Sequence, residues 1–177
     1  MEIKALLLED LAIDRALVRI AHEIVERNKG VENVVLLGIA RGGIPICERL
    51  ANNISNIENI SVPIGTIDIA LYRDDKKIVD SQTNYTKIDF SLQDKDVVLC
   101  DDVLYTGRTV RAAMEALFKY GRPRTIQLAV LIDRGHRELP FKADYVGKNV
   151  PTSRSEKVVV KFDSLNGNKA VIIDGAK

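Results

Sequence analysis

The chain has 177 residues, 46% of them hydrophobic, and its 26 basic and 25 acidic residues leave a formal net charge of +1. This size and composition fit a single domain with a substantial core, so we expect no second independent domain. The near-neutral balance gives no overall case for binding nucleic acid or membranes, and any basic surface must be local.

The N-terminal sequence and the cysteines favour a cytoplasmic protein. The first residues include Glu2 and Lys4 and lack the apolar core of a signal peptide, and no apolar run approaches the roughly 20 residues that a membrane span needs. Cys47 and Cys100 lie in apolar sequence without metal-ligand spacing. We therefore expect two buried, reduced thiols and no membrane association.

The first predicted elements are a short strand and an amphipathic helix. The strand covers 6–8, Asp10 is positioned to cap the helix, and Gly30 is positioned to end it. Apolar residues recur at helical spacing along one face, at Ile13, Leu17, Ile20 and Ile24.

The middle of the chain predicts a strand, a helix and a second strand. A buried strand within 34–43 runs into a glycine loop, and a helix follows from Ile44 and Pro45 to Asn53. Residues 62–72 alternate in polarity, which predicts a strand exposed on one side. The polar stretch 73–96 has no sustained period and is interpreted as a mobile, hairpin-like surface excursion that could serve as a lid.

The next elements complete an alternating α/β pattern. A buried strand at 97–100 precedes a helix over 108–120, which Gly121 ends, and a further buried strand covers 125–133. One face of this helix carries Val110, Ala113, Met114 and Leu117. The order predicts right-handed βαβ units and a mostly parallel central sheet with helices on both faces.

Two adjacent acids follow the strand at 97–100 and precede a Thr-Gly-Arg-Thr turn at 106–109. The carboxyl ends of parallel strands line the ligand crevice, where Asp101 and Asp102 could accept hydrogen bonds from vicinal sugar hydroxyls. The following helix start offers unpaired amides and a dipole that favours an anion. These residues predict a sugar phosphate site. A Rossmann site is discarded because no strand supplies its glycine-rich turn and following acid.

A second phosphate-binding element is the glycine loop at 39–43. Its backbone amides and the Arg41 guanidinium suit a diphosphate, although the glycines alone would also fit a plain strand-to-helix turn. Arg73 stands where the excursion begins, so it could swing over the diphosphate when a lid closes. Asp74 and the charged residues after it are interpreted as a solvated turn.

The pattern of four apolar residues, two acids, two apolar residues and Thr-Gly-x-Thr resembles the signature of type I phosphoribosyltransferases. Together with "LYRDD", "GRP" and the basic segment 133–157, nearly the whole chain resembles the bifunctional pyrimidine operon attenuator and uracil phosphoribosyltransferase family, PyrR. The resemblance implies a type I phosphoribosyltransferase fold in a single domain over 1–177. It also implies a small hood over the base site, formed by the N-terminal strand and roughly 134–177.

The resemblance implies an activity and its site residues. Uracil and 5-phosphoribosyl-1-diphosphate (PRPP) would give UMP and diphosphate, with Mg²⁺ held mainly by the substrate and no metal site of the protein's own. The catalytic residues would be Arg41, Arg73, Asp101 and Asp102. The nucleotide-binding set would add Ala40, Gly42, Val103, Leu104, Tyr105, Thr106, Gly107, Arg108 and Thr109. The base-binding hood would contain Arg134, Gly135, His136, Arg137 and Val158.

A basic face of the first helix lies opposite its apolar stripe. Glu23 and Glu26 interrupt it, so the residues alone favour an ordinary solvated face. The resemblance instead implies UMP-dependent binding to pyrimidine-operon leader RNA through Arg15, Arg19, His22, Arg27 and Lys148. Phosphate contacts of this kind would make binding salt-dependent. UTP as a further ligand and a homodimer or higher even-numbered homo-oligomer are also implied.

The sequence departs from the family pattern at two residues and one segment. Ala40 stands where a hydroxyl residue commonly precedes the loop arginine, Val18 stands where attenuators commonly carry threonine, and 73–96 is shortened and altered. Two alternatives stay open beside the bifunctional protein. One is a phosphoribosyltransferase for purines or other bases without RNA binding, and the other is an RNA-binding attenuator with vestigial activity.

Overall fold

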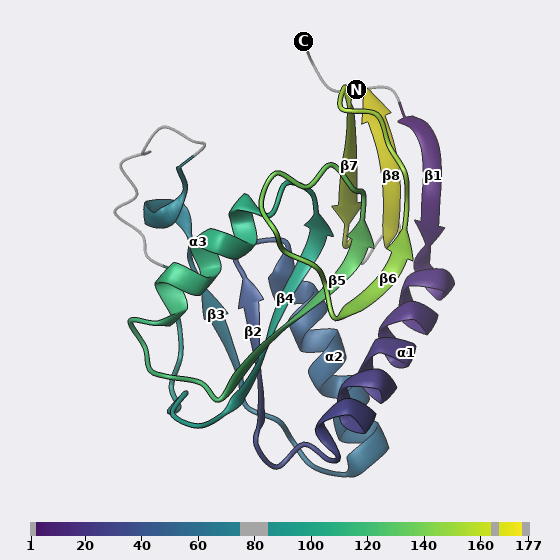
Figure 1. Cartoon of the computed structure of the whole chain (residues 1–177). Helices are drawn as coiled ribbons and strands as arrows, with labels where there is room; N and C mark the ends of the chain where they lie inside the picture. Colours follow the sequence, from purple (N-terminus) through teal and green to yellow (C-terminus); the bar gives the residue numbers. More distant parts are fainter. Residues whose placement is uncertain (1–2, 75–84, 164–166, 175–177) are drawn as a thin grey trace.

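A computed structural model describes residues 3–74, 85–163 and 167–174 and contains two sheets (Figure 1). The central sheet has the order β3 (Ile64–Ile67), β2 (Val34–Ile39), β4 (Asp96–Leu104), β5 (Thr125–Asp133) and β6 (Tyr145–Asn149), and every neighbouring pair is parallel. The second sheet is antiparallel, in the order β1 (Ile3–Glu9), β8 (Lys169–Asp174) and β7 (Glu156–Lys161).

Helices cover both faces of the central sheet, as the sequence predicts. The helices α1 (Asp10–Asn28) and α2 (Gly43–Glu58) pack in one core cluster, and α3 (Arg108–Leu117) packs in the other, together with residues that flank the 3-10 helix η1 (Ala70–Tyr72). Every residue of β2 is buried because the strand is central and covered on both sides. The predicted apolar stripe of α1 is buried throughout, and Cys47 and Cys100 are buried free thiols, as expected.

Several predicted boundaries were wrong. Glu9, not Asp10, is the N-cap of α1, and it makes no side-chain capping bond. The helix α2 continues to Glu58, and α3 ends at Leu117 rather than at 120. The strand predicted at 97–100 continues to Leu104, because β4 keeps its pairing with β5 to the end of both strands. The two acids therefore lie within the strand and not after it.

The strand predicted over 62–72 was also too long. The chain leaves the sheet after Ile67 because the Asp68 carboxylate accepts the backbone N–H groups of Ala70, at 2.9 Å, and Tyr85, at 3.1 Å. Part of the predicted excursion, 75–84, lies outside the described residues. Beyond it the chain returns to β3 through an antiparallel bridge between Thr66 and Lys87, and Leu92 is fully buried.

The second sheet joins the two ends of the chain. Figure 1 shows β1, β7 and β8 together beyond the carboxyl ends of the central strands. The strand β6 falls within the predicted hood range but pairs with β5 in the central sheet, so the second sheet uses only the part of that range from Glu156 onward. Within the described ranges, no helix combines the length and apolar character that a membrane crossing requires.

Candidate active site

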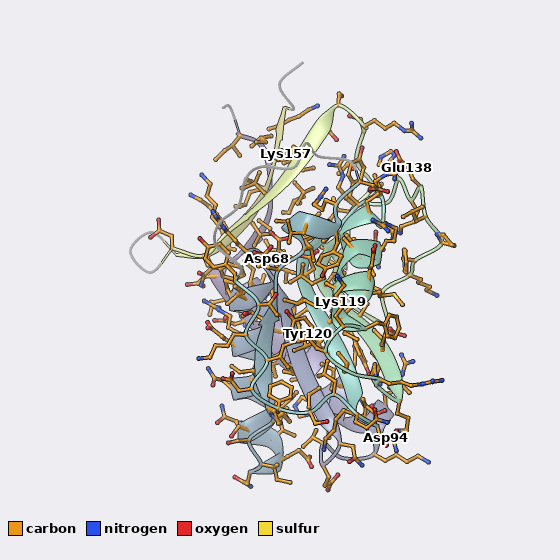
Figure 2. The ribbon with its side chains drawn as sticks, turned by 90° about the vertical axis from the view of Figure 1, so that its left-hand side faces the viewer. Asp68, Asp94, Lys119, Tyr120, Glu138 and Lys157 are labelled. Carbon is orange, nitrogen blue, oxygen red and sulfur yellow. The ribbon has the colours of Figure 1, made fainter. Side chains whose placement is uncertain are left out.

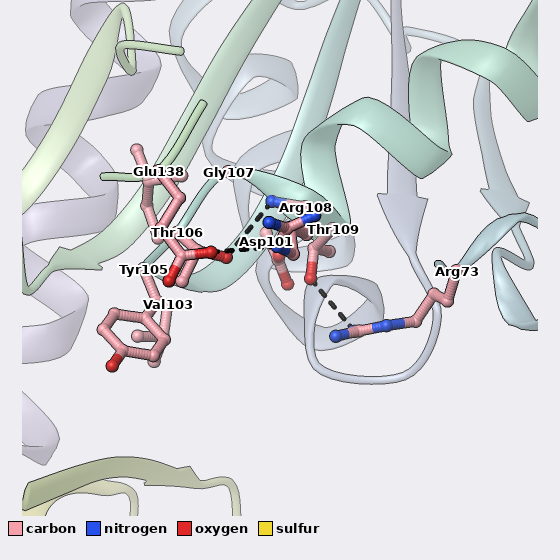
Figure 3. Close-up of a pocket in the computed structure, with 10 residues that line it drawn as sticks. Arg73, Asp101, Val103, Tyr105, Thr106, Gly107, Arg108, Thr109 and Glu138 are labelled. Carbon is pink, nitrogen blue, oxygen red and sulfur yellow. Dashed lines mark hydrogen bonds and ion pairs between the residues drawn. The ribbon is translucent and has the colours of Figure 1, made fainter. Parts of the chain in front are cut away.

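A cavity of about 290 Å³ opens at the carboxyl end of the central sheet (Figure 3). The end of β4, the start of α3 and Arg73 surround it. Figure 2 shows at which end of the molecule the cavity lies. Glu138, which lines the cavity, is near the end that carries Lys157 of β7, and Asp94 lies at the opposite end. The cavity is lined by Arg73, Asp101, Val103, Leu104, Tyr105, Thr106, Gly107, Arg108, Thr109 and Glu138.

The two adjacent acids have different surroundings. Successive strand residues point to opposite faces, so Asp101 faces the cavity on the α3 side while Asp102 faces the loop before α2. Asp101 is 7% exposed, and burial raises the pKa of its carboxyl well above the ordinary value. The negative charge of Asp102 raises this pKa further, and the nearby Arg73 partly offsets the increase.

Backbone amides also bind these carboxylates. Asp101 Oδ1 accepts the N–H of Asp102 at 2.9 Å, and Asp102 Oδ1 accepts the N–H of Val103 at 2.8 Å. These bonds fix both side chains against the strand before any ligand binds. The site thus holds one buried carboxyl and one partly exposed carboxyl in set positions.

The turn before α3 is shaped for an anion. Gly107 has φ +94°, and a Cβ there would lie 3.0 Å from Phe141 Cδ2 and 3.3 Å from Leu139 Cβ, so this position requires glycine. Thr106 Oγ1 accepts the N–H of Arg108 at 3.3 Å. The first turn of α3 then directs its remaining amides, and the positive end of its dipole, toward the cavity. A phosphate group fits this end.

The glycine loop before α2 lies directly against the acid pair. A Cβ on Gly42 would come within 2.5 Å of the Asp102 carboxyl carbon, and a Cβ on Gly43 would lie 1.9 Å from the Cys100 carbonyl oxygen. Only residues without a side chain permit this approach. The peptide bond between Ala40 and Arg41 is cis. Ala40, Arg41 and Gly42 do not line the cavity; the loop lies against Asp102, which is next to the cavity residue Asp101 in β4.

Arg73 is already part of the site. Its Nη1 donates to Thr109 Oγ1 at 3.1 Å, as Figure 3 shows, so it extends to the phosphate turn rather than lying out on an excursion. Asp74 is exposed at a bend, which agrees with its interpretation as a solvated turn residue, and it also pairs with arginines of α3. Its carboxylate accepts from Arg108 Nη1 at 3.1 Å and lies 3.7 Å from Arg111 Nε, which ties the segment after η1 to α3.

The loop after β5 packs against the phosphate turn. The Thr106 carbonyl accepts the N–H groups of Glu138 and Leu139, at 2.9 and 3.0 Å. Arg137 Nη1 donates to the Tyr105 carbonyl at 2.6 Å, and Arg134 lies over the Tyr105 ring with 4.0 Å between Cζ and the centroid. Four of the five predicted base-binding residues, those at 134–137, therefore lie in a loop that packs against the phosphate turn and forms one wall with it.

The same loop is anchored to the segment before β7. Arg134 is 4% exposed and donates to Thr152 Oγ1 at 3.1 Å and to the Ser153 carbonyl at 2.8 Å. His136, with φ +61°, makes a hydrogen bond with the Thr152 carbonyl. A Cβ on Gly135 would meet no atom within 4 Å, so open space lies beside this loop. Val158 is buried in the core on β7, and its assignment to the base site stays a prediction.

The predicted RNA-binding residues lie on or beside the exposed face of α1. A shallow groove of about 510 Å³ runs along it, lined by Leu11, Asp14, Arg15, Val18, Arg19 and His22. Three members of the predicted set bind other residues of their own chain. Arg19 donates to the carbonyls of Val146 and Gly147, at 3.0 and 2.8 Å, and Lys148 donates to the Leu7 carbonyl at 3.0 Å. Arg27 forms an ion pair with Asp144 at 2.5 Å.

Residues 3–74, 85–163 and 167–174 contain no group of three His, Cys, Asp or Glu side chains that could hold a metal ion. The cavity does offer the Asp101 carboxylate, and Mg²⁺ prefers oxygen ligands and keeps several from substrate and water. The residues present thus fit a magnesium ion that arrives with a phosphorylated substrate.

Three residues of this region were missed from the sequence. Glu138 lines the cavity and accepts from Arg108 Nε at 3.0 Å, Asp74 pairs with the same arginine, and Tyr85 lies under the Arg41 guanidinium. Each acts through a contact between distant segments. No local sequence motif indicates that these residues belong to the site. Glu138 could have been predicted, because it directly follows the predicted base-binding residues at 134–137.

Comparison with known proteins identifies the family. The sequence pattern of the phosphoribosyl transferase domain matches residues 7–166. The bifunctional protein PyrR of Clostridium novyi is 56% identical over 175 residues, which cover 98% of both chains. The bifunctional protein PyrR of Clostridioides difficile is 58% identical over 172 residues, 96% of this chain and 97% of the relative.

Solved structures support the fold. The hypoxanthine phosphoribosyltransferase of Trypanosoma cruzi, in complex with the product IMP, superposes with a TM-score of 0.73 at 21% identity and covers 97% of this chain and 91% of its own. A hypoxanthine-guanine phosphoribosyltransferase of Bacillus anthracis gives a TM-score of 0.67 at 21% identity, with 85% and 86% of the two chains covered. The chain belongs to the phosphoribosyltransferase family and, by its full-length relatives, to the bifunctional PyrR proteins.

Proposed function

We infer that the chain is a uracil phosphoribosyltransferase that also regulates the pyrimidine operon through UMP-dependent binding to leader RNA. The observation that carries the enzyme assignment is one cavity that brings together the buried Asp101, an anion-binding helix start and Glu138 of the loop after β5. A molecule with a phosphate, a sugar and a flat base has matching partners along this wall. The full-length relatives named PyrR support the bifunctional assignment.

The site would work mainly by positioning and electrostatics. Displacement of diphosphate from the anomeric carbon builds positive charge on the ribose and negative charge on the leaving group. The 5-phosphate binds the turn at 106–109, and Asp101 and Asp102 hold the ribose hydroxyls. Arg73 and Arg41 would both donate to the diphosphate. Mg²⁺ arriving with PRPP would neutralise part of the diphosphate charge, with Asp101 as the carboxylate that the cavity offers it.

The base would occupy the space beside the loop at 134–137. Gly135 leaves that space open, and bonds to Thr152 and Ser153 fix the loop that would present backbone groups to a flat heterocycle. Uracil is assigned through the family and not through this geometry. The hypoxanthine enzymes share the fold at low identity, so base choice must be measured.

A substrate profile tests the enzyme assignment. The purified chain is incubated with PRPP, Mg²⁺ and uracil, hypoxanthine, guanine or orotate in turn, and nucleotide formation is followed by chromatography. We expect UMP from uracil and little product from the other bases. Preference for a purine would support the alternative of a purine phosphoribosyltransferase, and no product with any base would leave an attenuator with vestigial activity.

A binding titration tests the regulatory assignment. A labelled pyrimidine-operon leader hairpin is titrated with the chain, with and without UMP, at two salt concentrations. We expect tighter binding with UMP and weaker binding at high salt, because Arg15 and its neighbours would contact phosphates. Equal affinity for the hairpin and for an unrelated RNA would contradict the assignment. A homodimer or higher even-numbered oligomer, which would present two such faces, stays a prediction.

A further inference from the structure

The Arg41 guanidinium lies over an aromatic ring that no motif predicted. The distance from Arg41 Cζ to the centroid of the Tyr85 ring is 5.4 Å, within the range of a cation–π contact. Arg41 belongs to the glycine loop before α2, and Tyr85 belongs to the chain that returns to β3 after the excursion. The contact therefore connects two segments that border the carboxyl end of the central sheet.

Tyr85 is fixed by the end of β3. Its N–H donates to Asp68 Oδ2 at 3.1 Å, and its carbonyl accepts from Thr66 Oγ1 at 2.6 Å. Thr66 and Lys87 then exchange two backbone hydrogen bonds of 2.9 Å, and Thr86 Oγ1 accepts the N–H of Asp68 at 2.9 Å. The backbone of Tyr85 is thus held from both sides, while its side chain stays 47% exposed. Such a backbone can hold the ring in a set place.

Arg41 differs from the other arginines at this end of the sheet. Arg73, Arg108 and Arg137 donate to protein acceptors. Arg41 is exposed, and its guanidinium makes no hydrogen bond or ion pair with the described residues; what it contacts there is the Tyr85 ring. Stacking uses the flat face of a guanidinium and leaves the donors in its plane available. Tyr85 can therefore orient Arg41 without occupying the groups that would bind an anion.

We propose that Tyr85 is a positioning residue for the diphosphate end of PRPP: its ring holds the Arg41 guanidinium beside the glycine loop, with the N–H donors ready for phosphate oxygens. The gain comes from preorganisation, because a long side chain that is already ordered loses less freedom when the ligand binds. The inference rests on the proposed function, since it takes Arg41 as a diphosphate ligand. It assigns to Tyr85 no contact with the reacting atoms.

Steady-state kinetics of UMP formation test this role. Tyr85→Ala should raise the KM for PRPP about twofold to fivefold and leave kcat and the KM for uracil unchanged, since an exposed cation–π contact contributes about 0.5–1 kcal/mol. Tyr85→Phe keeps the ring and should restore the wild-type KM. Tyr85→Leu keeps bulk without the π face and should behave like Tyr85→Ala, which covers the case in which the alanine variant folds poorly. Tyr120→Ala, at another partly exposed tyrosine, is the matched control.

Two further measurements make the test specific. In an Arg41→Ala background, Tyr85→Ala should add no further rise in KM, because the partner is gone. Calorimetric titration with inorganic diphosphate should show weaker binding to Tyr85→Ala than to the wild type, and this readout does not require turnover. A chain that binds diphosphate in a Tyr85-dependent way but forms no UMP would overturn the proposed function and keep this inference. An unchanged KM, failure of Tyr85→Phe to rescue, or full additivity with Arg41→Ala would overturn the inference itself.

Discussion

At the scale of single residues, the two neighbouring aspartates of β4 differ in how they affect the free energy of unfolding. Asp101 is buried, and burial together with the charge of Asp102 raises its carboxyl pKa well above the ordinary value. The folded chain then binds this proton more tightly than the unfolded chain does. Stability from this group is present at low pH and is lost as the pH rises through the folded pKa.

Asp101→Asn should therefore stabilise the fold at neutral pH, because an amide has no charged form to bury and keeps an oxygen that can accept the N–H of Asp102. The difference between variant and wild type should increase from about pH 4 upward. Chemical denaturation at several pH values measures it. A variant that is less stable than the wild type at every pH would contradict the electrostatic argument.

Asp102→Asn should affect turnover and not stability. Its carboxylate is partly exposed, abuts Gly42 and would lose a charge-assisted bond to a ribose hydroxyl. Such bonds contribute about 1.5–3 kcal/mol, so kcat/KM for PRPP should fall about tenfold to a hundredfold. The melting temperature, measured alongside, should stay close to that of the wild type. Unchanged kinetics would remove Asp102 from the ribose site.

At the scale of elements, what could be predicted follows from whether the signal is local. β2, β4 and β5 each contain an apolar run because both faces of the central sheet are covered. The acid pair and the phosphate turn are close together in sequence. The residue at which β3 ends could not be predicted from the sequence, because Asp68 turns the chain out of the sheet by accepting a hydrogen bond from Tyr85, which is distant in sequence. Glu138 and Asp74 enter the site for the same reason, through Arg108.

Two arginines of α1 that are predicted to bind RNA differ in their contacts within the chain. Arg15 is exposed on the groove, whereas Arg19 also holds two carbonyls of β6. We expect Arg15→Ala to weaken leader-RNA binding and to reduce the slope of log affinity against log salt by about 1, with UMP synthesis unchanged. Filter binding at several salt concentrations measures both quantities.

Arg19→Ala serves as the comparison. It should weaken RNA binding and also lower the free energy of unfolding by about 1 kcal/mol, because it leaves the carbonyls of Val146 and Gly147 without their donor. If Arg15→Ala left RNA affinity and its salt dependence untouched, this face of α1 would not be the RNA surface.

At the scale of the whole molecule, the second sheet is tied to the central one at several points. Lys148 of β6 donates to the Leu7 carbonyl of β1 at 3.0 Å, which joins the two sheets. The ion pair between Lys4 of β1 and Glu156 of β7, at 2.7 Å, connects two strands of the second sheet itself. The segment between β6 and β7 anchors the loop after β5 through Thr152. The wall at which we place the base is thus braced by the connection to the second sheet.

Thr152→Val tests whether this brace serves base binding. Valine keeps the shape but removes the hydroxyl that accepts from Arg134 Nε, at 3.1 Å, and donates to the Arg134 carbonyl, at 3.2 Å. With Arg134 less firmly held, the loop loses a fixed position, and the KM for uracil should rise about threefold to tenfold, as expected for lost hydrogen bonds of about 1 kcal/mol. The KM for PRPP should not change, because the phosphate turn has its own anchors. Ser155→Ala, in the same segment, is the control. An equal rise in the KM values for uracil and for PRPP in Thr152→Val would show that the bonds between Thr152 and Arg134 support the whole cavity and not the base site alone.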